Sequence, residues 1–101
     1  MTKTVRLISG VGFTPGSAQD QREGLVGYVT LTFADLLLLD GLVLRRTAAS
    51  KHTLSFPNRT DRRGERHPYY RPLDDSARRV IEDAVFAALG ISRDATGDNH
   101  E

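Results

Sequence analysis

One stretch of this chain decides its fold: Leu54–Gly90, LSFPNRTDRRGERHPYYRPLDDSARRVIEDAVFAALG. An alternating run, an arginine-rich turn, a second short run and a capped amphipathic segment predict two strands and a helix. Asp74 is a good N-cap, and Gly90 suits the position just after a helix. Apolar residues recur between them at helical spacing: Val80, Ile81, Ala84, Val85, Ala88 and Leu89. We therefore predict a helix over Asp75–Leu89 that packs on a sheet.

The two strands before this helix follow from alternation and from turn residues. His52–Pro57 alternates, with its two large apolar side chains on one face. Asn58–Glu65 predicts a hairpin loop in which Gly64 takes a positive φ. Arg66–Arg71 predicts a short second strand. Because Pro68 cannot donate a hydrogen bond to a neighbouring strand, we place this strand at a sheet edge.

The first half of the chain contributes further strands. Thr4–Ser9 and Leu25–Phe33 alternate and are rich in β-formers, whereas Gly10–Gly24 predicts a long flexible loop. An alternative is that Val11–Phe13 continues the first strand. Ala34–Arg46 is ambiguous. Asp35 could cap a helix there, but a glycine and a valine within the run disfavour one. Periodicity does not decide between helix and strand for a run that is apolar on both faces.

Length and composition bound the class of protein. A chain of 101 residues with 39% hydrophobic residues forms one domain with a small core. We place that domain at residues 1–90 and expect the polar tail, residues 91–101, to be disordered. The chain has no cysteine, which excludes disulfides and thiolate metal sites. It carries no export signal or apolar run of membrane-spanning length, so we expect a cytoplasmic protein with no membrane contact.

The net charge of +1 conceals a basic middle segment. Between Arg45 and Arg79 the chain has ten Lys or Arg and four Asp or Glu, a local balance of +6, while the remainder carries −5. Nine of these ten cations are arginine, whose planar guanidinium binds phosphate bidentately. A basic segment of this kind favours a nucleic-acid partner. The alternative is a solvated face that four acidic residues partly neutralise: Asp61, Glu65, Asp74 and Asp75.

The order of these motifs resembles the SpoVG family, the stage V sporulation protein G or septation regulator group of bacteria. The resemblance covers roughly Val5 to Leu89. The matching segments are Thr32-Phe33, Leu36 to Leu44, Phe56-Pro57-Asn58-Arg59, Arg63-Gly64-Glu65, Arg71-Pro72-Leu73-Asp74 and Ile81-Glu82-Asp83-Ala84-Val85. Each segment is short, and the resemblance lies in their order and spacing. The chain departs from the family in a longer first loop, in Asp40-Gly41 within the apolar strand, and in Tyr69-Tyr70.

The resemblance has consequences for fold and function. It implies that the leucine run Leu36–Leu44 is a strand. It therefore implies an α+β fold, an antiparallel sheet of four to five strands with one packed C-terminal helix. It further implies a homodimer built partly through strand pairing. The implied function is that of a non-enzymatic regulator that binds DNA or RNA without a cofactor; the preferred nucleic acid and the pathway, septation or sporulation, stay open.

Arginines on the predicted hairpin and at the helix start are the candidate phosphate-binding residues. They are Arg59, Arg62, Arg63, Arg66, Arg71, Arg78 and Arg79. Arg78 and Arg79 fall in the first turns of the helix, where a cation opposes the helix dipole, which hints at a use other than stability. Tyr69 and Tyr70 point to opposite faces of a strand. At most one of them can therefore stack on a base while the other packs.

The leucine run is the candidate dimer surface. A strand that is apolar on both faces must be covered twice, and one helix covers only one face. The predicted contact residues are Leu36, Leu38, Leu42 and Leu44. The alternative is a central strand that the monomer covers by itself. An alternative function is a protein-interaction module in division or septation, whose arginines only make the surface soluble.

No group of residues predicts catalysis. Asp74-Asp75 is explained by helix capping, and Glu82-Asp83 is expected on the exposed side of the helix. The sequence has no nucleophile elbow and no glycine-rich loop with the spacing of a phosphate cradle. We therefore expect no enzyme, no cofactor and no small-molecule substrate. The histidines lack metal-ligand spacing, so we expect no metal site and place His52 and His67 on the surface.

Overall fold

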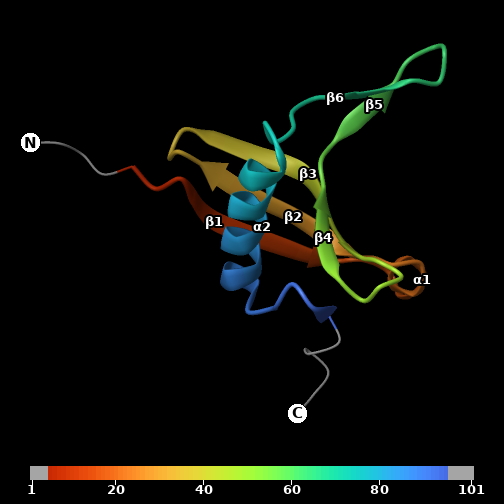
Figure 1. Ribbon diagram of the computed structural model, residues 1–101, viewed down its shortest axis with the longest axis horizontal. Coiled ribbons are helices and arrows are strands. Elements are labelled where there is room, and N and C mark those ends of the chain that lie inside the picture. The colour runs from red at the N-terminus through yellow and green to blue at the C-terminus, as the bar shows by residue number, and fades with distance from the viewer. Residues whose placement is uncertain (1–4, 96–101) are drawn as a thin grey trace, which may run out of the picture.

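The computed structural model describes residues 5–95 and contains two packed layers, a four-stranded sheet and a helix. Its elements are β1 (Ile8–Pro15), α1 (Ala18–Arg22), β2 (Leu25–Phe33), β3 (Leu37–Arg46), β4 (His52–Ser55), β5 (Asn58–Thr60), β6 (Arg66–Pro68) and α2 (Asp75–Leu89). The sheet order is β1-β2-β3-β4, all antiparallel, and β5 pairs only with β6. In Figure 1, α2 crosses one face of the sheet and the β5–β6 hairpin projects beyond it. The predicted α+β class is confirmed.

A tight turn settles the ambiguous leucine run as a strand. Ala34 and Asp35 both have positive φ, 54° and 58°, and the amide of Leu36 donates to the Phe33 carbonyl at 2.9 Å. This is the type I′ geometry that matches the twist of two antiparallel strands. The carboxylate of Asp35 accepts from the backbone and side chain of Arg6, at 3.1 and 3.3 Å. Asp35 is thus a turn residue, and the reading of it as a helix cap is wrong.

A bulge in β3 determines which leucines face the core. Leu31 pairs with Leu39 and Val29 with Leu42, so β3 advances three residues while β2 advances two. The extra residue lies at Asp40-Gly41, where Gly41 has φ +80°. Because side chains alternate along a strand, one inserted residue moves all later side chains to the other face. The inward residues on β3 are therefore Leu37, Leu39, Leu42 and Leu44.

This bulge corrects half of the predicted dimer surface. Leu42 and Leu44 are 0% and 2% exposed within the monomer, so they belong to its core. Leu36 and Leu38 are 84% and 68% exposed. The four residues share one face only if the strand is regular, which the bulge prevents. A single helix covers the apolar face of β3, because the bulge directs most of the large side chains of this strand to one side of the sheet.

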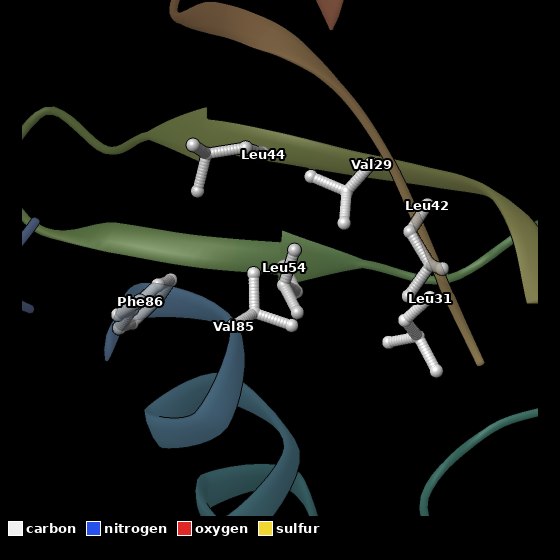
Figure 2. Close-up of a cluster of buried hydrophobic side chains, with 7 residues drawn as sticks. All are labelled: Val29, Leu31, Leu42, Leu44, Leu54, Val85 and Phe86. Atoms are coloured by element: carbon white, nitrogen blue, oxygen red, sulfur yellow. The ribbon is translucent and has the colours of Figure 1, made fainter. Parts of the chain in front are cut away.

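The core lies between the sheet and α2 (Figure 2). Its seven side chains are at most 3% exposed and come from four elements: Val29, Leu31, Leu42, Leu44, Leu54, Val85 and Phe86. The helix bounds are as predicted. Asp74 caps the first turn by accepting from the amide of Ala77 at 2.8 Å, and Gly90 follows the last turn with φ 72°.

Two other segments are more ordered than the sequence predicts. The expected flexible loop contains most of β1 and then α1, which begins with a capping box between Ser17 and Asp20. At the other end, the expected disordered tail starts with Ile91–Ala95, which pairs with the chain before β4. The amide of Ala95 donates to the Ser50 carbonyl at 2.8 Å, and Ala95 is 6% exposed. The last part of that predicted tail, residues 96–101, lies outside the described residues.

The predicted hairpin is wrong in its first strand and in the length of its second. The partner of β6 is Asn58–Thr60, which the sequence predicts as part of the loop, whereas His52–Ser55 pairs with β3. β6 ends at Pro68, and residues 69–74 connect it to α2. The sheet therefore has four strands, and the hairpin stands apart as a ribbon of two short strands. Within residues 5–95, no helix is long and apolar enough to cross a membrane.

Candidate nucleic-acid interface

Side chains of α2 close the open edge of the sheet. β4 is an edge strand, and the outward amide of Leu54 donates to the Glu82 carboxylate at 3.1 Å. The hydroxyl of Thr53 donates to the same oxygen at 3.2 Å, and Arg78 donates to the Leu54 carbonyl at 3.1 Å. An edge whose backbone groups are already bonded cannot pair with another strand. Glu82 is 2% exposed, so the expectation that it lies on the exposed side of the helix is wrong.

The buried carboxylate of Glu82 is compensated from the segment after α2. Arg93 donates to Glu82 and, at 2.7 Å, to Asp83, and its guanidinium carbon lies 5.3 Å from the centre of the Phe86 ring. These two carboxylates raise the pKa of Arg93, with the hydrogen bond to Glu82 as the larger cause. A buried charge needs such partners, because water no longer solvates it. Arg93 thus ties the end of the described chain to the helix and sheet.

Asp61 holds the loop of the β5–β6 hairpin. One carboxylate oxygen accepts from the amides of Arg63 and Glu65 at 2.8 and 3.0 Å, and the other bonds the His67 ring at 2.7 Å. The bond from His67 and then the amide of Glu65 hold the pKa of Asp61 below its ordinary value of 3.8. Gly64 provides the predicted positive φ, +83°. Asp61 is therefore directed at the loop backbone and at His67, and not at an arginine.

We expect the loop to loosen in acid. The pKa of Asp61 is lower in the folded protein than its ordinary value of 3.8. The ionised carboxylate therefore stabilises the loop fully above pH 3.8, and this stabilisation is lost as the pH falls through the pKa of the folded state. In an NMR pH titration, the chemical shifts of the Arg63 and Glu65 amide protons should change with a midpoint below pH 3.8. In a His67→Asn variant that midpoint should move up. A midpoint at or above 3.8 in the unmodified protein contradicts this assignment.

This loop also brings together Asp61, Glu65 and His67, whose potential metal-binding atoms lie within 4.8 Å of one another. Both oxygens of Asp61 are engaged by the loop and by His67. The hairpin adds four arginines, so its charge opposes a cation. We assign no metal to this cluster.

Most candidate arginines of the hairpin and helix start are exposed and have no acidic partner within residues 5–95. Six of the seven form no ion pair with a carboxylate within the described residues: Arg59, Arg62, Arg63, Arg66, Arg71 and Arg79. The seventh, Arg78, lies 3.9 Å from Glu82. The acidic residues that could neutralise this face do not pair with it, since Asp61 bonds the loop and Asp74 caps α2. The positive charge is left for solvent or for an anionic partner.

Three arginines from distant parts of the chain converge on one cavity of about 670 Å³, here called the arginine cleft. They are Arg45 on β3, Arg66 on β6 and Arg78 on α2, and polar lining comes from Thr53, Ser55 and Asn58. Arg45 donates to the Ser55 hydroxyl at 3.0 Å, and the guanidinium carbon of Arg78 lies 5.8 Å from the centre of the Phe56 ring. No acidic residue is among those that line the cleft.

The seven predicted arginines lie at different places in the structure. Arg66 and Arg78 share the arginine cleft, and Arg79 lines a smaller cavity beside it with Arg78 and Arg93. Arg59, Arg62 and Arg63 lie on the projecting hairpin (Figure 1). Arg71 lines a different cavity, which shares only Phe56 with the cleft.

Arg45 belongs to the basic segment but is not among the arginines that the sequence predicts for the site. Its place in the cleft depends on the antiparallel register of β3 and β4, in which Arg45 pairs with Thr53. No local motif signals that register.

The aromatic and histidine predictions have mixed outcomes. Tyr69 is 67% exposed, whereas Tyr70 packs edge-on against Phe56 and donates to the Asp40 carbonyl at 2.7 Å. One tyrosine is thus free and the other packs, as predicted. Burial, and then the charge of Asp40, raise the pKa of Tyr70. The prediction for His52 is wrong, because it is 7% exposed and its ring lies 2.7 Å from the Ser92 carbonyl.

Comparison with known proteins adds no relative. No family model, no curated protein and no solved structure matches this chain.

Proposed function

We propose that this protein is a non-enzymatic, cytoplasmic regulator of the SpoVG type that binds DNA or RNA by its phosphate backbone. The observation that carries the proposal is the set of exposed arginines on the hairpin and helix start that have no acidic partner in the part of the chain that the structure describes. Guanidinium groups in this state can bind phosphate without first breaking an ion pair. Displaced counterions then add a salt-dependent driving force to the binding.

The arginine cleft gives this interface a centre. Arg45, Arg66 and Arg78 reach it from three elements, so the folded chain presents them together at a fixed spacing. Hydroxyl and amide groups from Thr53, Ser55 and Asn58 provide further hydrogen-bonding groups for phosphate or sugar. The hairpin arginines extend the contact outward along the strand of nucleic acid, and exposed Tyr69 can stack on a base.

A homodimer is part of this proposal, with a smaller surface than the sequence suggested. Leu36 and Leu38, both largely exposed, are the predicted contact residues that stay available to a second subunit. The same leucines favour the alternative function, a protein-interaction module without nucleic-acid binding. Affinity for nucleic acid separates the two functions.

The test is to measure binding of short duplex DNA and single-stranded RNA across a salt series. We expect log–log slopes of roughly −3 to −8, because each neutralised phosphate contributes about −0.9 for duplex DNA and −0.7 for single strands. A protein that binds neither nucleic acid at low salt contradicts the proposal. That result would leave the exposed leucines as the surface for a protein partner.

A further inference from the structure

A second cavity lies across Phe56 from the arginine cleft. Its volume is about 490 Å³, and it is bounded by the inward face of the sheet near the β2–β3 turn, the first half of α2 and the Tyr70–Leu73 segment that leads into that helix. The sheet contributes residues such as Leu31 and Leu39, and α2 contributes Ala77 and Ile81. The volume falls within the range typical of sites for small organic molecules.

The lining of this cavity is apolar apart from two residues. The hydroxyl of Tyr70 is already bonded to the Asp40 carbonyl, so mainly the ring of Tyr70 is available. Arg71 is exposed and forms no ion pair with a carboxylate of residues 5–95. No acidic residue lines the cavity. The cavity thus combines an apolar interior with a single cation.

Apolar surface at the rim is left open to water. Leu73 is 96% exposed and Leu37 is 58% exposed, and both line the cavity. Covering such side chains is favourable because it removes apolar surface from water. An occupant with an aliphatic body gains this stabilisation, and an anionic end gains a charge-assisted hydrogen bond to Arg71.

We propose that this cavity binds a small amphipathic anion, with an aliphatic chain against the leucines and a carboxylate-type head group on Arg71. The size and the lining argue for a small molecule, because side chains of the inward sheet face, of α2 and of the Tyr70–Leu73 segment enclose about 490 Å³. Along this cavity β2 is paired on both edges, whereas residues 37–42 of β3 pair only with β2. Arg71 is also one of the candidate phosphate-binding arginines, but it does not line the arginine cleft, so decanoate binding and nucleic-acid binding are measured separately.

The test uses decanoate as the probe and 1-decanol as its uncharged counterpart, titrated by calorimetry into the full chain below the micelle concentration. We expect saturable binding of one decanoate per chain and about tenfold or more weaker binding of decanol. Arg71→Gln should weaken the binding of decanoate by a similar factor and leave the binding of decanol unchanged. Arg79→Gln is the matched control, because Arg79 is an exposed arginine of α2 outside this cavity and should leave decanoate binding unchanged.

A filling variant locates the probe. Ala77→Phe places a ring in the cavity and should abolish decanoate binding, with circular dichroism to verify the fold. If that variant does not fold, methyl NMR shifts of Leu39 and Ile81 on decanoate addition serve instead. The proposal is overturned if decanoate binding does not saturate. It is also overturned if decanoate binds no better than decanol and Arg71→Gln has no effect. A third contradicting result is that neither Ala77→Phe nor the methyl shifts locate decanoate in this cavity. A stable dimer that excludes decanoate also overturns it, since a second copy would then cover the cavity.

Discussion

Glu82→Ala should destabilise the protein by about 3–5 kcal/mol, because the buried carboxylate joins an ion pair with Arg93 and two hydrogen bonds whose donors lose their acceptor. The carboxylate is 2% exposed and accepts from the Leu54 amide, the Thr53 hydroxyl and Arg93. Without it, the Leu54 amide at the sheet edge is buried and unpaired, and the C-terminal segment loses its anchor. For a domain of this size, each 1 kcal/mol corresponds to roughly 4–8 °C in Tm. Calorimetric melting should therefore show a loss of more than about 12 °C.

The neighbouring carboxylate provides the control for this prediction. Asp83 pairs with the same arginine at 2.7 Å, but its side chain is 72% exposed. Water and salt screen exposed pairs, so Asp83→Ala should cost at most about 1 kcal/mol. Glu82→Gln, which keeps the shape but not the charge, should fall between the two. If the Glu82→Ala and Asp83→Ala variants melt at the same temperature, Glu82 is not the anchor of the β4 edge.

The combined variant Arg62→Ala, Arg63→Ala and Arg66→Ala should lose most of its nucleic-acid affinity while keeping its melting temperature. Each charge-assisted bond to phosphate contributes about 1 kcal/mol or more, so three together correspond to roughly a hundredfold in Kd. The salt slope should become shallower by about 2–3. Stability should change little, because the three side chains are exposed and form no ion pair within residues 5–95.

A second triple variant separates the position of the charge from its amount. Arg22, Arg46 and Lys51 lie at the α1 end of the sheet, away from the hairpin. Their replacement by alanine removes the same charge and should change Kd by only a few-fold through the long-range field. Equal losses in the two variants would mean that net charge and not the hairpin governs binding. An unchanged Kd in the first variant would exclude the hairpin from the interface.

Local patterns predicted the elements whose causes are local. α2 has its cap, its apolar stripe and its terminal glycine within one continuous segment, and its bounds are as predicted. The hairpin loop has Gly64 where a positive φ is required. The candidate arginines were found in the same way, since a run of like charges is visible in any sequence. Their exposure was predictable, and their lack of acidic partners was not.

The errors concern features that depend on pairing across the chain. The prediction for β3 assumes that side chains alternate regularly through Asp40-Gly41. The bulge at these two residues turns Leu42 and Leu44 to the opposite face of the sheet. Glu82 is expected on the exposed side of α2, and glutamate is rarely buried. It is buried because β4 ends the sheet and its free amide needs an acceptor. Neither requirement is visible until the strand order is known.

The sequence by itself determined the capped helix, the turn at Gly64 and the arginines around it, because capping and turn chemistry act between residues a few positions apart. The tertiary structure alone decided the register of β3, the burial of Glu82 and the meeting of Arg45, Arg66 and Arg78 in one cleft. It also decided that Arg71 stands at an apolar cavity apart from them. These outcomes follow from hydrogen bonds and packing between segments far apart in the chain, which a linear pattern does not encode.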